Sequence, residues 1–278
     1  DKMDNTPMTY TLGIDASRWD LHPDWQQLKA GGIEFAILKA SQGRSTRDLR
    51  FEQHLQGASA AGLICAAYHW CDPLHDDQPQ AENFLTAIAG KPLAFAAVDV
   101  EQYWQDWTEW QNKRITRLIP GSRISQNALT TAAEIKARSG LPVLIYTRAS
   151  FVREYAPQML AWLPQWDLWL AHYPYGSGRV TCSWEQLRGH FPRINGPSLP
   201  AGCRQWRFWQ FSADKFMLPG AHSPLDLNFF NGDLSQLKAW CRMDSLEKST
   251  INIQPEEMLE RLWLAHPEIH PKNGGSIK

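Results

Sequence analysis

Short apolar runs alternate with amphipathic stretches along most of this chain. Between the runs, apolar residues recur at helical spacing, as at Phe51, Leu55 and Ala58, and glycine or proline marks most segment ends. The pattern predicts strands at 11–15, 33–39, 63–68, 93–101, 142–146, 167–171, 206–211 and 225–229. It predicts helices at 23–30, 48–61, 80–88, 125–139, 234–241 and 150–162, the last with a kink near Pro157.

The alternation of strand and helix holds through the first five or six strands and then changes. Residues 176–202 are rich in Gly, Pro, Arg and Ser and are expected to form a long loop or a small hairpin. No full helix fits between the last two strands, and the Trp-rich stretch before Gly121 fits no single element. This order predicts a parallel α/β barrel with an incomplete helical ring over its last quarter. A doubly wound open sheet is the alternative.

Polar side chains lie at or just past the C-terminal ends of the predicted strands. In a barrel these ends form one rim, where active sites are built. Such a placement therefore favours the barrel over the open sheet, and it predicts that distant sequence positions converge on one site. The residues concerned are Asp15, Lys39, His69, Asp99 with Glu101, Tyr146, Tyr173, Gln210 and Asp226.

Two acids with one residue between them, Asp99 and Glu101, end the most apolar strand. Because strand side chains alternate, both point to one side, roughly 6.6 Å apart along the backbone at about 3.3 Å per residue. Crowding keeps one of them protonated, which supplies the acid and the anion that glycoside cleavage needs. The spacing suits the ~5 to 5.5 Å carboxyl separation of retaining enzymes better than the roughly 6.5 to 9.5 Å of inverting ones. Alternatively, the acids cap the next helix or bind a nearby arginine.

Composition narrows the class of protein. Lys and Arg total 28 against 29 Asp and Glu, so the net charge of -1 gives no reason to expect nucleic acid or an anionic membrane as a partner. No run approaches the ~18 apolar residues of a membrane span, and the polar start of the chain lacks the apolar core of a signal peptide. The 14 Trp residues are expected to pack in the core or to offer flat surfaces to sugars.

Cysteines and acidic clusters give no firm sign of a metal or cofactor, and we expect neither. None of the five Cys residues forms a Cys-x-x-Cys pair; Cys182 and Cys203 could bridge the 176–202 segment, but buried thiols are an equal alternative. A loop with four potential ligands is expected to be solvated rather than metal-binding. Its residues are Asp72, His75, Asp76 and Asp77.

Several strand motifs, taken in order, resemble those of family 25 glycoside hydrolases, the N-acetylmuramidase lysozymes that cut the β-1,4 link between N-acetylmuramic acid and N-acetylglucosamine in peptidoglycan. The resemblance covers about residues 10–241. Trp70 stands where the family commonly has Phe, and Ala16 where it has Val. The motifs include Gly13-Ile14-Asp15-Ala16-Ser17, Tyr68-His69-Trp70, Val98-Asp99-Val100-Glu101, Ile145-Tyr146-Thr147, Trp209-Gln210-Phe211-Ser212 and Leu225-Asp226-Leu227-Asn228.

The resemblance implies a TIM-like (β/α)5(β)3 barrel that cuts glycan strands of peptidoglycan with retention of configuration. Glu101 matches the general acid/base, and Asp99 matches the second carboxylate, either a nucleophile or the group that steadies a substrate-assisted intermediate. Asp15 and Asp226 match the other two acids. The residues that match the lining of the sugar site are Tyr68, Tyr146, Tyr173 and Trp209; Gln210, Lys39 and His69 are further expected substrate contacts.

We expect three segments: a tail at 1–9, a catalytic barrel at 10–241, and a linker with an amphipathic helix at 242–278 that packs on the barrel or on a partner. The protein is expected to act as a monomer on the cell wall, as a secreted or a phage-released enzyme. A chitinase-like hydrolase also ends a strand in Asp-x-Glu, but its upstream glycine and further acids are missing before Asp99. A non-catalytic peptidoglycan-binding barrel would have no need of the crowded acids.

Overall fold

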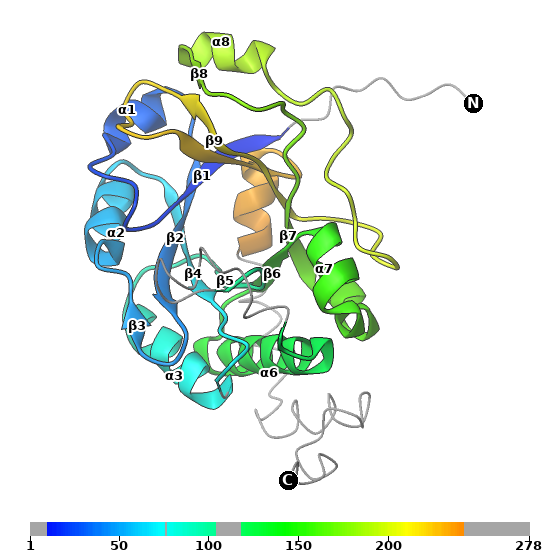
Figure 1. Ribbon diagram of the computed structural model, residues 1–278. Helices are drawn as coiled ribbons and strands as arrows, with labels where there is room; N and C mark the ends of the chain where they lie inside the picture. Colours follow the sequence, from blue (N-terminus) through cyan, green and yellow to red (C-terminus); the bar gives the residue numbers. More distant parts are fainter. Residues whose placement is uncertain (1–9, 76, 104–117, 242–278) are drawn as a thin grey trace, which may run out of the picture.

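A computed structural model describes residues 10–75, 77–103 and 118–241. Its centre is a closed barrel (Figure 1), because β1 pairs with β2 on one side and with β10 on the other. This closure confirms the predicted barrel and excludes the open sheet. The barrel strands are β1 (Thr11–Ala16), β2 (Phe35–Gln42), β4 (Ile64–Trp70), β5 (Ala96–Asp99), β6 (Val143–Thr147), β7 (Asp167–Ala171), β9 (Phe208–Met217) and β10 (Leu225–Phe230). The short β3 (Thr46–Arg47) and β8 (Val180–Thr181) pair with β2 and β9.

The last barrel strand runs against its neighbours. The strands from β1 through β9 are parallel around the barrel, whereas β10 is antiparallel to both β9 and β1. The prediction of an all-parallel barrel is therefore wrong for this strand. A parallel return needs a crossover of a dozen or more residues, and only residues 218–224 connect β9 to β10.

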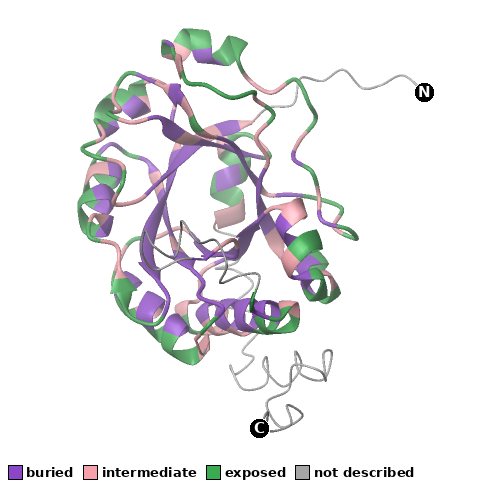
Figure 2. Cartoon of the chain, in the orientation of Figure 1, coloured by how far each residue is buried: buried purple, intermediate pink, exposed green. Residues whose placement is uncertain are grey.

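Helices cover the outside of the barrel with their buried sides toward the strands and their exposed sides toward solvent (Figure 2). In α6 the buried residues Ile124, Ala128, Leu129, Ala132 and Ile135 recur every three or four positions, which places them along one face. The helix predicted at 150–162 is interrupted near Pro157 rather than kinked, because α7 ends at Tyr155 and two 3-10 turns follow. The elements are α1 (Trp25–Ala30), α2 (Phe51–Ala60), α3 (Asp77–Ile88), α6 (Gly121–Ser139), α7 (Ala149–Tyr155), η1 (Pro157–Ala161) and η2 (Leu163–Gln165).

The 176–202 segment is more structured than expected. It contains β8 and a short helix, α8 (Trp184–Gly189), which begins with a capping box between Ser183 and Gln186. Trp184 lies directly over Gly31, where a Cβ atom would come within 2.3 Å of its ring. The segment thus packs against the C-terminal end of α1 instead of forming a free loop.

One end of the barrel is filled with aromatic rings and closed by a helix. Phe35, Phe95, Phe208 and Phe230 are buried in the interior. Residues 234–241 form a helix, drawn in orange in Figure 1, whose Trp240 ring lies 5.2 Å from that of Phe95 and 5.6 Å from that of Phe208. The helix predicted at 234–241 is confirmed, and it packs on the barrel. Since the parallel strands start at this end, the site must lie at the other.

The cysteines and the loop that begins at Asp72 differ in part from expectation. Cys182 and Cys203 are free thiols, so they do not form a bridge. Asp72 is buried, accepts the backbone N–H of Leu74 and contacts the His75 ring, so the idea of a wholly solvated loop is wrong for this residue. No cluster of His, Cys, Asp and Glu with the makings of a metal site occurs among the described residues.

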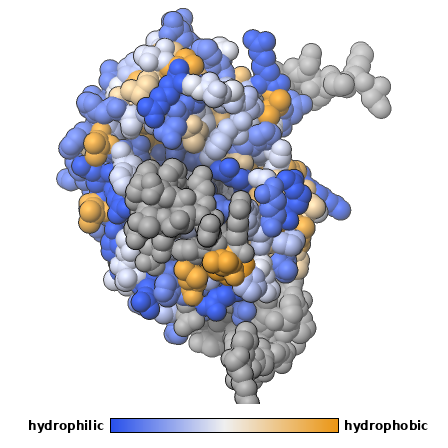
Figure 3. Space-filling model, in the orientation of Figure 1, coloured by the Kyte–Doolittle hydropathy of each residue, from blue (hydrophilic) through white to orange (hydrophobic). Residues whose placement is uncertain are grey.

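In the part of the chain that the structure describes, no helix is long and apolar enough to cross a membrane. The face of the molecule in Figure 3 is largely hydrophilic, with small separate hydrophobic areas. The predicted tails at 1–9 and 242–278, Asp76, and most of the Trp-rich stretch before Gly121 lie outside the described residues.

Candidate active site

Asp15 and Asp226 face each other across one strand pair at the open rim. Asp15 is near the end of β1, and its register partner in β10 is Asp226. Asp226 was expected at the C-terminal end of a strand but lies near the start of β10. Because β10 is antiparallel, its start belongs to the same rim as the ends of the parallel strands. The two acids therefore meet for a different topological reason than the one predicted.

Asp99 and Glu101 lie at the same rim. Asp99 ends β5 and is buried, while the Glu101 side chain is 26% exposed. The backbone N–H of Val100 donates to the Tyr146 carbonyl at 2.9 Å, so the strand pairing continues one residue beyond β5. Among the described residues, Asp99 Oδ1 is buried and has no hydrogen-bond partner. Burying a carboxylate oxygen without a hydrogen-bond partner costs free energy, unless the carboxyl group is protonated or a ligand supplies the partner.

Burial and crowding act on the proton affinity of this pair. Burial raises the pKa of Asp99 well above its usual range, the charge of Glu101 adds to the rise, and the charge of Lys39 opposes it. Burial also raises the pKa of Glu101, against the lowering effect of Arg148, whose Nη2 lies 3.9 Å from Glu101 Oε2, and of Lys39. The carboxyl pair therefore holds a proton at a higher pH than free side chains would.

Two amide groups fix Asp15 in place. Gln210 Nε2 and Asn228 Nδ2 each donate to Asp15 Oδ2 at 2.7 Å. Burial raises the pKa of Asp15 to about 7, although both hydrogen bonds lower it. Asn228 is itself held by Trp169, whose Nε1 donates to Asn228 Oδ1 at 2.7 Å. Asn228 lies two residues after Asp226, so strand alternation alone brings both to the interior.

Gln210 connects the rim tyrosines to Asp15. Its Oε1 accepts hydrogen bonds from the hydroxyl groups of Tyr146, at 2.7 Å, and Tyr173, at 2.5 Å, while its Nε2 binds Asp15. The side chain is 3% exposed, and protein groups use both ends of its amide. Gln210 thus bridges residues of four strands or their ends, and its expected role as a direct substrate contact stays a prediction.

Lys39 and Tyr68 also face the interior. Lys39 Nζ donates to Gln42 Oε1 at 2.7 Å and lies 4.3 Å from the centre of the Trp70 ring. Burial lowers the pKa of Lys39 to about 8, while the charge of Asp99 acts in the opposite direction. Burial raises the pKa of Tyr68 well above its usual range, so this hydroxyl stays neutral.

Two expected substrate contacts lie elsewhere. His69 follows Tyr68 and points outward, fully buried, with Nδ1 2.8 Å from Ser41 Oγ and its ring packed against Phe84. Trp209 precedes Gln210 and also points outward, fully buried, donating to the His172 carbonyl at 2.8 Å. Both side chains support the layer between barrel and surface and lie outside the candidate site. Adjacent strand residues alternate sides, so the sequence already contained this signal.

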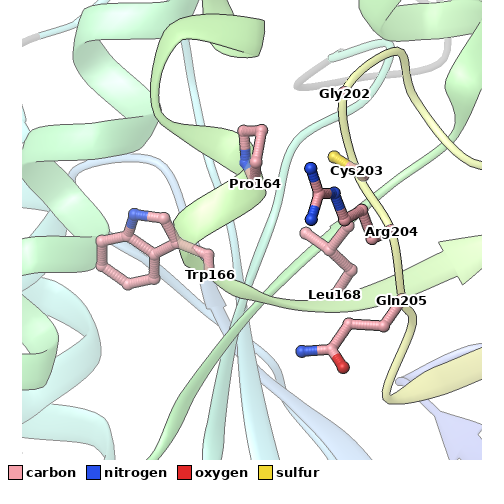
Figure 4. Close-up of a pocket in the computed structure, with 7 residues that line it drawn as sticks. All are labelled: Pro164, Trp166, Leu168, Gly202, Cys203, Arg204 and Gln205. Carbon is pink, nitrogen blue, oxygen red and sulfur yellow. The ribbon is translucent and has the colours of Figure 1, made fainter.

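Arg148 is a rim residue that the sequence did not single out. It is the first residue after β6, and its guanidinium lies near Glu101 and over the Tyr173 ring. A separate surface pocket of about 520 Å³, shown in Figure 4, lies by the start of β7. None of the predicted site residues lines it: its lining consists of Pro164, Trp166, Leu168, Gly202, Cys203, Arg204 and Gln205.

A closed α/β barrel with carboxyl groups crowded at the C-terminal rim is typical of glycoside hydrolases. Comparison with known families agrees: the model for glycosyl hydrolases family 25 matches residues 14–220. The chain belongs to this family and is a hydrolase of the lysozyme and muramidase class.

Individual relatives are distant but span most of the chain. The protein YegX of Escherichia coli is 29% identical over 84% of this chain and 75% of its own length. Lysozyme M1 of Streptomyces globisporus is 26% identical over 82% of this chain and 70% of its own length. The crystal structure of the bacterial lysozyme from Streptomyces coelicolor superposes with a TM-score of 0.67 at 24% identity, covering 85% of this chain and 99% of that one. The likeness to the Streptomyces coelicolor lysozyme structure shows the fold alone.

Proposed function

We propose that the protein hydrolyses the β-1,4 bond between N-acetylmuramic acid and N-acetylglucosamine in peptidoglycan, with retention of configuration. The observation that carries this proposal is the pair Asp99 and Glu101, two residues apart at the open rim of the barrel and facing Asp15 and Asp226. Membership of family 25 and the muramidases among its relatives support the substrate. The site of action is then the cell wall.

In the first step Glu101 gives its proton to the bridging oxygen as the bond from that oxygen to the sugar C1 breaks. Glu101 suits this role because it is the more exposed member of the pair and its raised pKa preserves the proton. Asp99 must be the ionised member during this step; the charge of Lys39 favours this state, against burial and the charge of Glu101, which raise the pKa of Asp99. It either bonds to C1 or accepts the N–H of the 2-acetamido group, whose own oxygen then bonds to C1.

In the second step water restores the enzyme. The Glu101 carboxylate takes a proton from a water molecule whose oxygen attacks C1, and the bond formed in the first step breaks. Two inversions give net retention.

The other acids act through charge and position. Burial raises the pKa of Asp15 to about 7 and that of Asp226 well above its usual range, so the pair holds protons near neutral pH. Where one of them is ionised, its negative charge would stabilise the positive C1 of the transition state. Gln210 holds Asp15 and the two tyrosine hydroxyls in one arrangement, so we assign it a positioning role.

The proposal is tested by digesting purified peptidoglycan and identifying the sugar at the new reducing ends by mass spectrometry after borohydride reduction. We expect reduced N-acetylmuramic acid together with loss of turbidity. Reduced N-acetylglucosamine would contradict the proposed bond. Cleavage of N-acetylglucosamine oligomers in preference to walls would instead favour the chitinase-like alternative, and binding to walls with no new ends would favour the non-catalytic one.

A further inference from the structure

Arg148 places a cation at the edge of the acidic rim. Its backbone is extended, with φ −133° and ψ 149°, at the junction of β6 and α7. Its Cζ atom lies 5.4 Å from the centre of the Tyr173 ring, and Nη2 lies 3.9 Å from Glu101 Oε2. The side chain is 41% exposed. Stacking on a ring that is itself hydrogen-bonded to Gln210 holds the guanidinium plane in place.

The contact with Glu101 is too long for a hydrogen bond, which needs about 3.2 Å or less for N–H to O. An arginine fork can hold a carboxylate through two parallel hydrogen bonds, and the present distance does not realise this geometry with Glu101. Arg148 also lowers the pKa of the group that must donate a proton. As a partner for Glu101 alone, Arg148 is thus poorly placed and works against catalysis.

A carboxylate on the substrate would give the Arg148 guanidinium a partner at hydrogen-bond distance, and pairing with it would weaken the effect of Arg148 on the pKa of Glu101. We propose that Arg148 binds a carboxylate of the substrate close to the bond that is cut, and so selects acidic glycans over neutral N-acetylglucosamine polymers. This inference rests on the proposed function, since N-acetylmuramic acid differs from N-acetylglucosamine by a lactyl ether that ends in a carboxyl group. In peptidoglycan the acidic group is either this lactyl carboxylate or a carboxylate of the peptide attached to it.

Binding such a carboxylate has a consequence for catalysis. Once Arg148 is paired with the substrate, its charge no longer lowers the pKa of Glu101 as strongly, and Glu101 keeps its proton to a higher pH. The remaining groups around Glu101 stay as they are and act on the acidic and the neutral substrate alike. They are Lys39 of β2, Asp99 of β5, Asp15 of β1, Tyr146 of β6 and Tyr173 beyond β7.

The experiment measures binding of two matched pairs of sugars by NMR titration of the full chain. The first pair is N-acetylmuramic acid and its methyl ester, which have nearly the same shape but differ in charge. The second is N-acetylmuramoyl-L-alanine and its methyl ester, which moves the carboxylate to the peptide. We expect the wild type to bind the acid about three- to tenfold more tightly than the ester in at least one pair, the range for a partly exposed charge-assisted contact.

Arg148→Gln should bring the acid-to-ester ratio in that pair close to one. Arg153→Gln is the matched control, because Arg153 lies on α7, is 73% exposed and pairs with Glu154; it should leave the ratio unchanged. A preference in the first pair assigns the lactyl carboxylate, and a preference only in the second assigns the peptide. A wild type that binds neither acid better than its ester, or an Arg148→Gln protein that keeps the preference, overturns the proposal.

The titration requires no turnover, so its outcome is separate from that of the proposed function. An enzyme that cuts walls but shows no acid preference keeps the muramidase assignment and loses the carboxylate site. A protein with an Arg148-dependent preference that releases no new sugar ends keeps the carboxylate site and loses the proposed reaction.

Discussion

The two ends of the barrel interior differ in polarity, although the same strands supply the side chains of both. At the closed end, Phe35, Phe95, Phe208 and Phe230 fill the interior under the helix at 234–241. At the open end, the inward positions of the same strands hold carboxyl, amide and phenol groups, and the buried Asp99 Oδ1 has no partner among the described residues. The closed end gains stability by burying apolar surface. At the open end, burial of the carboxyl groups costs free energy of desolvation and keeps some of them protonated near neutral pH.

This division teaches that activity and stability should respond to different substitutions in this molecule. Layers of side chains separate the ends, so a change in the aromatic layer should leave the geometry of the acids largely intact. A change among the acids should not open the core. The substitutions below try to break this separation, and they run from the largest expected effect to the smallest.

Glu101→Gln should reduce the rate of wall cleavage by about 10²- to 10⁴-fold, because the amide has no proton to donate to the leaving oxygen. Thermal unfolding should be nearly unchanged. The measurement is the initial rate of turbidity loss per folded molecule, with Glu154→Gln, an exposed acid on α7, as the control. A folded Glu101→Gln protein with a near-normal rate would show that another group is the acid.

Phe208→Ala should lower the free energy of unfolding by about 3 to 5 kcal/mol, because it leaves a cavity against Phe35, Phe95 and Trp240. The rate per folded molecule should stay within about twofold of the wild type at a temperature where both are folded. Urea unfolding and wall turbidity measure the two quantities. Trp19→Ala, at a ring that is 72% exposed, is the control for loss of an aromatic side chain. A large loss of rate in folded Phe208→Ala would disprove the separation of the ends.

Gln210→Met should lower kcat by about tenfold, since Tyr146, Tyr173 and Asp15 each lose a hydrogen bond. The pKa of Asp15, about 7 in the wild type, should rise further because a hydrogen bond that lowers it is gone. Carboxyl NMR titration of Asp15 separates this positioning role from a structural one. An unmoved titration would mean that Gln210 does not control the proton of Asp15.

Asp15 should make folding less favourable as pH rises. Its folded pKa of about 7 exceeds the 3.8 of an unperturbed aspartate, so the folded state binds the proton more tightly and stability falls between about pH 4 and pH 7. Asp15→Asn removes this contribution, and the free energy of unfolding should decline less over that range than in the wild type. Urea unfolding at several pH values measures the difference. Parallel curves for the two proteins would contradict the raised pKa.

Much of the fold could be predicted because the period of apolar residues specifies strands and helices locally. The direction of β10 was not predicted, because the apolar pattern of a strand does not depend on the direction in which the strand runs. The short connection after β9 indicates the antiparallel direction, since it cannot form a parallel crossover. That the helix at 234–241 closes the barrel depends on how its Trp240 contacts the rings of Phe95, Phe208 and Phe230, which no local pattern encodes.

The acids of the candidate site were predictable because strand ends mark one rim. His69 was placed at the site because it follows a predicted strand, and Trp209 because it matches the lining of the sugar site in the family. Alternation along each strand nevertheless sends them to the side opposite Tyr68 and Gln210. Arg148 carries the same signal, since it lies just past the end of β6, but its approach to Glu101 depends on packing against Tyr173, which no local pattern encodes.

The central claim is that Asp99 and Glu101 act as one pair on a muramic acid linkage. The most direct test is proton NMR of the first products released from soluble peptidoglycan fragments, recorded before the free sugar changes its anomeric form. The account predicts new N-acetylmuramic acid reducing ends that appear first as the β anomer. Initial formation of the α anomer, or reducing ends of N-acetylglucosamine, would contradict it.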